Sequence, residues 1–143
     1  MLFPAQLEGN QKDGYTVTFR DVPEAVTQGD TLDKAKANAI EALITSMDFY
    51  FEDRRPVPTP SKAQRSEVLV SIPPSVAAKV LLLNEVVRTK QRPMDLARAM
   101  NVRPQEITRL LDLHHTTKID ALADAFRAIG FDLEVRISPR AAA

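Results

Sequence analysis

A period-two pattern of apolar and polar residues near the start of the chain predicts strands. Residues 15–20 alternate aromatic or aliphatic side chains with polar ones, as in a half-buried strand. Residues 2–8 predict another strand, and residues 9–14 between them are rich in Gly, Asn, Lys and Asp, which are typical of turns. We therefore expect a hairpin, and residues 25–28 can supply a short third strand.

A helical pattern follows over residues 31–51. Its apolar side chains recur every three or four residues and form one wide stripe, as needed to cover a sheet. Residues 52–64 then place a proline at every second position from 56 to 60, which excludes a helix and favours an extended loop. Residues 67–72 predict one more strand. The order βββαβ indicates an α+β domain over residues 1–72.

The second half of the chain, residues 73–143, is predicted to be an all-helical domain with one strand at its end. The expected helices run from Pro74 to about Lys90 and then over 93–100, 104–112 and 118–129. Thr117 and Asp120 resemble a capping box at the start of the last helix, and Gly130 can end it.

Residues 131–137 alternate strictly between apolar and charged residues, which predicts an amphipathic strand. One strand is not stable alone. We therefore expect it to pair with its own copy in a homodimer or a higher even oligomer. The contact residues would be Phe131, Leu133, Val135 and Ile137.

Composition excludes several classes of protein. The 143 residues are 44% hydrophobic and 27% charged, as in an ordinary soluble domain, and there is no cysteine for disulfides, thiolate metal sites or nucleophilic catalysis. The longest aliphatic run, residues 80–87, is too short to span a bilayer, and no secretory signal is visible. We expect a cytoplasmic protein without a membrane partner.

Charge is distributed unevenly although the net charge is zero. Residues 1–72 carry 11 acidic and 8 basic side chains, whereas residues 73–143 carry 8 acidic and 11 basic ones. Within the second half, residues 88–118 hold seven basic residues against three acidic ones. An acidic half beside a basic segment suggests two partners, one of them polyanionic, although many such charge runs are only solvated surfaces.

Residues 93–110 have the internal spacing of a helix-turn-helix motif. Ala97 is small at the point where a second helix would cross closely, and Asn101 tolerates the positive φ that the turn requires. Val102, Ile107 and Leu110 then return to the core. The alternative interpretation is a helical hairpin with a solvated basic face.

In that register Gln105, Thr108 and Arg109 point outward from the second helix, where such motifs meet base edges. Arginine can bind guanine through two hydrogen bonds, and glutamine can bind adenine in the same way. Further DNA contacts, mainly to phosphates, are expected from Arg92, Arg103, His115 and Lys118.

The two histidines of the chain, His114 and His115, do not indicate a metal site. Neighbouring residues on a helix point about 100° apart, and the chain has no third histidine and no cysteine. A phosphate contact or a packing contact at the end of the second helix is the better interpretation. No metal and no cofactor are predicted.

Four stretches taken together strongly resemble the HicB antitoxins of type II toxin–antitoxin systems, in the subgroup with a C-terminal helix-turn-helix. They are DVPEAVTQGDTLDKAKANAIEAL, DFYFED, SIPPSVAAKVLLLNE and QEITRLLDLHHTTKIDAL, in the family's order over nearly the whole chain.

The resemblance implies a partial ribonuclease-H-like fold over residues 1–72, without its activity, that binds and blocks a HicA-type ribonuclease toxin. It implies that residues 73–143 dimerise and bind operator double-stranded DNA. The protein would thereby repress transcription of its own operon. The acidic half suits a basic partner, and the basic half suits DNA.

No motif marks the residues that would face the toxin. The candidates lie in an acidic loop and in the acidic, aromatic end of the first helix: Asp21, Glu24, Asp48, Tyr50, Glu52 and Asp53. Packing of the aromatic residues 49–51 under the proline loop is an equally good interpretation of that helix end.

Two rival functions remain open. A minimal ribonuclease would need metal-binding carboxylates on its first strand, and the only acid there is Glu8, where the strand gives way to the turn. We therefore expect a protein that is not an enzyme. The other rival is a stand-alone transcriptional regulator with a ligand-sensing N-terminal domain, but the chain has no glycine-rich phosphate loop that would support it.

Overall fold

The computed structural model describes residues 1–140, and residues 141–143 of the predicted second domain lie outside that range. Four antiparallel strands form one sheet in the order β3-β2-β1-β4. The strands are β1 (Leu2–Asn10), β2 (Gly14–Phe19), β3 (Val26–Gly29) and β4 (Val68–Ser71). With helix α1 (Leu32–Asp53) between β3 and β4, the predicted order βββαβ is confirmed.

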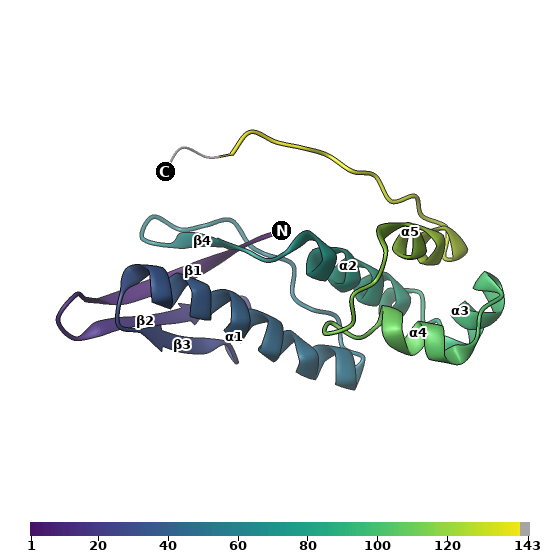
Figure 1. Cartoon of the computed structure of the whole chain (residues 1–143), viewed down its shortest axis with the longest axis horizontal. Coiled ribbons are helices and arrows are strands. Elements are labelled where there is room, and N and C mark those ends of the chain that lie inside the picture. The colour runs from purple at the N-terminus through teal and green to yellow at the C-terminus, as the bar shows by residue number, and fades with distance from the viewer. Residues whose placement is uncertain (141–143) are drawn as a thin grey trace.

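Helix α1 packs its apolar stripe on one face of the sheet, mainly over β2 and β3 (Figure 1). Thr31 caps its first turn, because the Thr31 hydroxyl accepts a hydrogen bond from the Lys34 amide at 3.2 Å. The end of β3 approaches this turn so closely that a Cβ on Gly29 would lie 2.4 Å from the Ala35 nitrogen. Glycine is therefore required where β3 leads into α1.

Four helices follow the sheet: α2 (Pro74–Arg88), α3 (Pro93–Met100), α4 (Pro104–Leu110) and α5 (Ile119–Ala128). They lie at the end of the elongated molecule opposite the tip of the β1–β2 hairpin (Figure 1). None of the helices within residues 1–140 is both long and apolar enough to cross a membrane.

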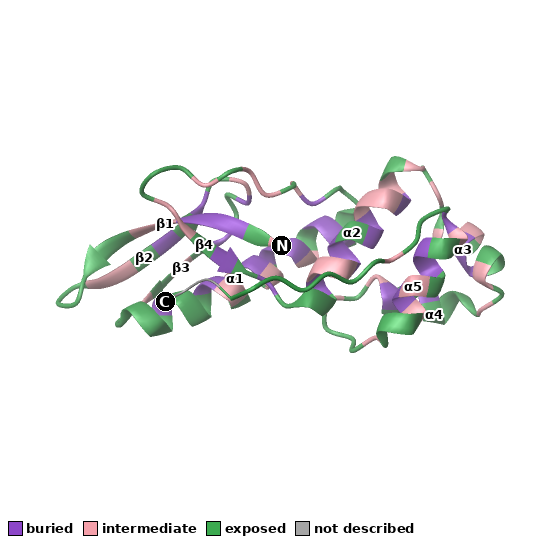
Figure 2. Cartoon of the chain, turned by 90° about the horizontal axis from the view of Figure 1, so that it is seen from above, coloured by how far each residue is buried: buried purple, intermediate pink, exposed green. Residues whose placement is uncertain are grey.

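Helix α2 belongs to two hydrophobic cores. Figure 2 shows buried residues in the sheet, in α2 and in the helices that follow it. Val76, Val80 and Leu83 pack against α1 and the sheet, whereas Leu82 and Val86 pack among α3, α4 and α5. A continuous helix therefore joins the two halves. The division of the chain at residue 72 stays a prediction.

The proline loop between α1 and β4 is held to the body at both ends. Val57 is buried, and the Asn84 side chain of α2 bonds both its amide, at 2.8 Å, and its carbonyl, at 3.0 Å. Near β4, the Arg20 guanidinium bonds the Glu67 carboxylate at 2.7 Å. Residues 55–64 contain no helix, as predicted, and the Asn84 contacts attach the start of the loop to α2.

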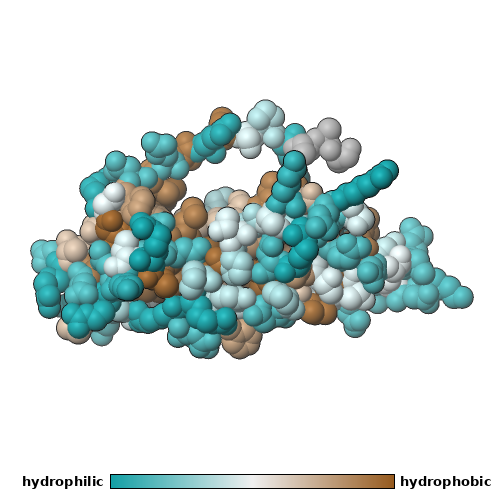
Figure 3. All heavy atoms as spheres, turned by 180° about the vertical axis from the view of Figure 1, so that it is seen from behind, coloured by the Kyte–Doolittle hydropathy of each residue, from teal (hydrophilic) through white to brown (hydrophobic). Residues whose placement is uncertain are grey.

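Residues 131–137 form no strand in the single chain. Because the predicted strand is one that pairs with a second copy, it stays a prediction. The Phe131 amide still bonds the Phe126 carbonyl at 2.9 Å, and Leu133 packs against the helical core. Beyond Leu133 the segment runs clear of the body without a strand partner (Figures 1 and 3). Val135 is 75% exposed and Ile137 is 92% exposed. The alternating pattern is present, yet a strand also needs a neighbouring backbone, which residues 1–140 of one copy do not supply.

Candidate functional sites

The turn between α3 and α4 has the backbone conformation that the sequence predicts. Asn101 adopts φ 55° and ψ 46°, and the Val102 amide bonds the Ala97 carbonyl at 3.0 Å. Leu96, Ala97 and the inward residues of α4 are buried against α5. Ala97 is buried, and the close crossing of α4 at this small residue stays a prediction.

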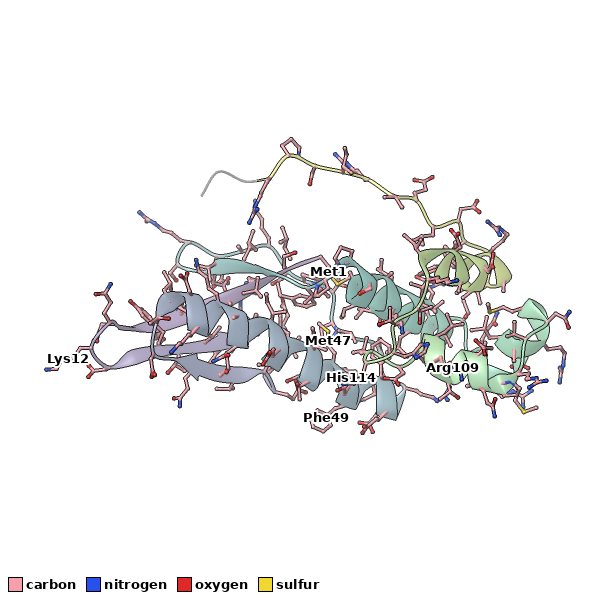
Figure 4. The ribbon with its side chains drawn as sticks, viewed as in Figure 1. Met1, Lys12, Met47, Phe49, Arg109 and His114 are labelled. Atoms are coloured by element: carbon pink, nitrogen blue, oxygen red, sulfur yellow. The ribbon has the colours of Figure 1, made fainter. Side chains whose placement is uncertain are left out.

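Helix α4 turns Ile107 and Leu110 inward and leaves Gln105, Thr108 and Arg109 exposed, as predicted. Figure 4 shows Arg109 on the surface of this helix. Arg109 is held by Glu106, one turn earlier, at 3.0 Å. An exposed pair of this kind is worth at most about 1 kcal/mol, so a phosphate or a guanine could replace Glu106.

The other residues predicted to contact DNA are all exposed, but one of them, Arg92, is bonded to a carboxylate of the same chain. Arg103, His115 and Lys118 are exposed beside α4 and α5. Arg92 is also exposed, but the Asp95 carboxylate accepts hydrogen bonds from both its guanidinium and its backbone amide, each at 3.1 Å. Arg92 therefore also helps to begin α3.

A buried lysine, which no pattern in the sequence indicates, bonds the backbone at the end of α4. The Lys79 ammonium of α2 donates to three backbone carbonyls at and beyond the end of α4: Arg109 at 3.0 Å, Asp112 at 2.6 Å and His115 at 2.6 Å. Burial lowers the pKa of Lys79. The carbonyl end of a helix stabilises a cation, so the arrangement suits the charged form.

His114 joins the loop after α4 to the end of α1 (Figure 4). Its Nε2 lies 2.6 Å from Oδ2 of Asp48, and its amide bonds the Asp112 carboxylate at 2.9 Å. The hydrogen bond to Asp48 and the charge of Asp48 raise the pKa of His114. The histidine that was not assigned to DNA therefore makes a contact within the chain. Within residues 1–140, no three His, Asp or Glu side chains are placed to share a metal ion.

The capping box predicted from Thr117 and Asp120 does not form. Lys118 is the N-cap residue directly before α5, and its side chain makes no capping hydrogen bond. The Thr117 hydroxyl is buried without a hydrogen-bond partner among the described residues. The helix begins one residue later than the box requires.

The fold brings the two predicted toxin-facing segments together. The Tyr50 hydroxyl of α1 donates to the Glu24 carboxylate at 2.9 Å. The Tyr50 ring and Phe51 are buried, which confirms the packing interpretation for these two residues, but Phe49 is 54% exposed (Figure 4). Burial also raises the pKa of Tyr50.

The acidic candidates are not equally available. The Asp21 carboxylate accepts from the Ser61 amide at 2.8 Å, Asp48 faces His114, and Asp53 pairs with Arg55 at 3.2 Å. Glu24 and Glu52 are exposed and have no cationic partner among the described residues.

Comparison with known proteins identifies relatives along nearly the whole chain. Residues 2–81 match the family model described as a HicB-like antitoxin of bacterial toxin–antitoxin systems. Antitoxin HicB 2 of Photorhabdus laumondii is 49% identical over 94% of this chain and 95% of its own length. Antitoxin HicB of Escherichia coli K12 is 44% identical, over 94% and 98% respectively. Antitoxin HicB of Pseudomonas fluorescens is 32% identical, over 91% and 90%.

Replacing Lys79 tests its role at the end of α4. We expect Lys79→Met to lower the free energy of unfolding by about 1–3 kcal/mol, because three carbonyls lose their buried donor. Chemical denaturation measures the change. Lys36→Met, on the exposed side of α1, is the control and should stay within about 0.5 kcal/mol. A Lys79→Met protein as stable as its parent would show that the ammonium is dispensable.

The contact between His114 and Asp48 predicts a pH dependence. Because the pKa of His114 in the folded chain is raised above its ordinary value of 6.5, the contact contributes fully below pH 6.5 and is lost as the pH rises through the raised value. An NMR titration of the His114 ring measures that pKa. We expect Asp48→Asn to lower it toward 6.5, and an unchanged titration would refute the contact.

Proposed function

The chain belongs to the HicB-like antitoxins of bacterial toxin–antitoxin systems, and from this membership we propose two binding functions for it. The first is neutralisation of a HicA-type ribonuclease toxin by residues 1–72. The second is autorepression, in which residues 73–143 of two copies bind operator DNA of the operon. The observation that carries the second proposal is the exposure of Gln105, Thr108 and Arg109 on one side of α4.

The geometry around α4 supports a helix-turn-helix in the sense in which DNA-binding proteins use it. A left-handed residue, Asn101, separates two short helices, and the small residue Ala97 is buried one turn before it. In such motifs the outward residues near the start of the second helix meet base edges in the major groove. Arg103 and Lys118, at the starts of α4 and α5, would then contact phosphates.

The distribution of charge supports toxin binding by the first half and DNA binding by the second. Residues 1–72 carry three more acidic than basic side chains, and residues 73–143 carry three more basic than acidic ones. A basic toxin would be attracted to the first half and DNA to the second. We propose that the first half acts by binding alone, because β1 offers no carboxylate before Glu8 for the metal ions of a ribonuclease H mechanism.

The segment after α5 supports a dimer. Val135 and Ile137 are more than two-thirds exposed, on a chain segment that stands clear of its own body. Pairing with the same segment of a second copy would cover these side chains and satisfy the free backbone groups. A two-fold dimer would place two α4 helices on an inverted repeat with half-sites about one helical turn or more apart.

Arg109→Ala tests the DNA surface. We expect the operator affinity to fall by about 1–3 kcal/mol, roughly five- to 150-fold, because one base-reading side chain is lost. A mobility-shift titration on the DNA upstream of the operon measures it. Arg65→Ala removes an exposed positive charge from the other half and should leave the affinity unchanged. Equal affinities for both variants and the parent would remove Arg109 from the site.

The dimer is tested by placing charges on the terminal segment. We expect the double substitution Val135→Asp and Ile137→Asp to give a monomer at micromolar concentration, since the carboxylates would have to be buried without partners. Light scattering measures the mass. Glu134→Gln, on the same segment, is the control. Because both apolar side chains are exposed in the single chain, the monomer should stay folded, and a dimer that persists would place the contact elsewhere.

A further inference from the structure

A groove runs between α1 and the free edge of β3. We call it the β3 groove, and its lining includes Glu24, Val26, Asn38, Glu41 and Phe49. Strand β3 is the last strand of the sheet on this side, so one of its edges has no strand neighbour. At one end of the groove the Asn38 amide bonds the Gln28 carbonyl at 2.9 Å, which closes part of the edge.

The lining combines exposed apolar surface with negative charge. Val26 is 59% exposed and Phe49 is 54% exposed, although both are large hydrophobic residues. Among the described residues that line the groove, Glu24 and Glu41 are carboxylates and none is cationic. An exposed apolar patch with a charged rim is the usual composition of a protein-binding surface.

The two carboxylates are free to take a cation from outside. Within residues 1–140 neither Glu24 nor Glu41 has a cationic partner, in contrast to Asp48 and Asp53 near the end of α1. The Tyr50 hydroxyl bonds both oxygens of Glu24 at 2.9 Å and so holds this carboxylate in one position. Each oxygen keeps a further lone pair for an incoming Lys or Arg.

We propose that the β3 groove is where the toxin docks, with an apolar side chain over Val26 and Phe49 and flanking Lys or Arg side chains on Glu24 and Glu41. The proposal rests on the toxin neutralisation proposed above and assigns it to one surface of the first half. It adds Val26, Glu41 and Phe49 to the residues expected to contact the toxin. Asp21, Asp48 and Tyr50, which the sequence also suggested for that role, instead make contacts within the chain.

Charge favours a basic protein over other occupants of the groove. Nucleic acid is excluded, because its phosphates would face two unpaired carboxylates. A second copy of the chain is less suited, since this protein carries no net charge and its free segment 131–137 bears two acidic side chains and one basic side chain.

The test compares two groove variants with a matched control. The probe is the toxin encoded beside this chain's reading frame, and calorimetric titration of the full-length chain measures its affinity. We expect Glu41→Lys and Phe49→Ala each to weaken binding about tenfold or more. Glu8→Lys reverses an exposed carboxylate outside the groove and should change binding less than about twofold.

The outcomes separate this proposal from the one on which it rests. Groove variants that bind the toxin as tightly as the parent would overturn the docking site while leaving toxin neutralisation intact. A parent chain that does not bind the toxin would overturn both. Light scattering completes the test, because a change of oligomeric state in Phe49→Ala with unchanged toxin affinity would assign the groove to a second copy. Retained operator binding by Glu41→Lys and Phe49→Ala shows that a loss of toxin affinity is not unfolding.

Discussion

Lys79 buries an ammonium group against three carbonyls at and beyond the end of α4, and this contact joins that end of the helix to α2. Removing a charge from water is costly unless hydrogen bonds and an opposite potential replace the water. Here the Arg109 carbonyl at the end of α4 and the Asp112 and His115 carbonyls that follow the helix supply both. Because α2 packs in both hydrophobic cores, the same lysine also fixes α4 relative to the sheet.

A second contact, in the loop after α4, also ties the two halves together. His114 follows the helix and bonds Asp48 near the end of α1. The surface proposed for DNA and the helix that lines the β3 groove are therefore parts of one packed body. Their charges stay separate: the exposed cations lie around α4, whereas the unpaired carboxylates Glu24 and Glu41 lie beside β3.

Sequence patterns predicted the features that repeat along the chain or depend on one residue's backbone preference. The four strands of the sheet, the five helices and the left-handed Asn101 belong to this group. Contacts between distant residues could not be predicted this way. A lysine in an apolar helix normally points to solvent, so the residues around Lys79 give no sign that its ammonium is buried. The sequence places Asp48 among the candidates for a toxin contact, and it gives no sign that Asp48 bonds His114, which follows 66 residues later. The alternation of residues 131–137 indicated a strand, but pattern alone does not supply the second backbone that a strand requires.

The central claim is that α4 presents Gln105, Thr108 and Arg109 to a DNA groove. Site-specific photocross-linking tests it most directly, with a photoreactive amino acid at Thr108 and, for comparison, at Thr16 on the exposed side of β2. The account predicts that only the probe at Thr108 attaches to a duplex carrying the operon's upstream DNA, and that it does not attach to a scrambled duplex. Cross-linking from Thr16 but not from Thr108, while the chain remains bound to its operator, would contradict the account.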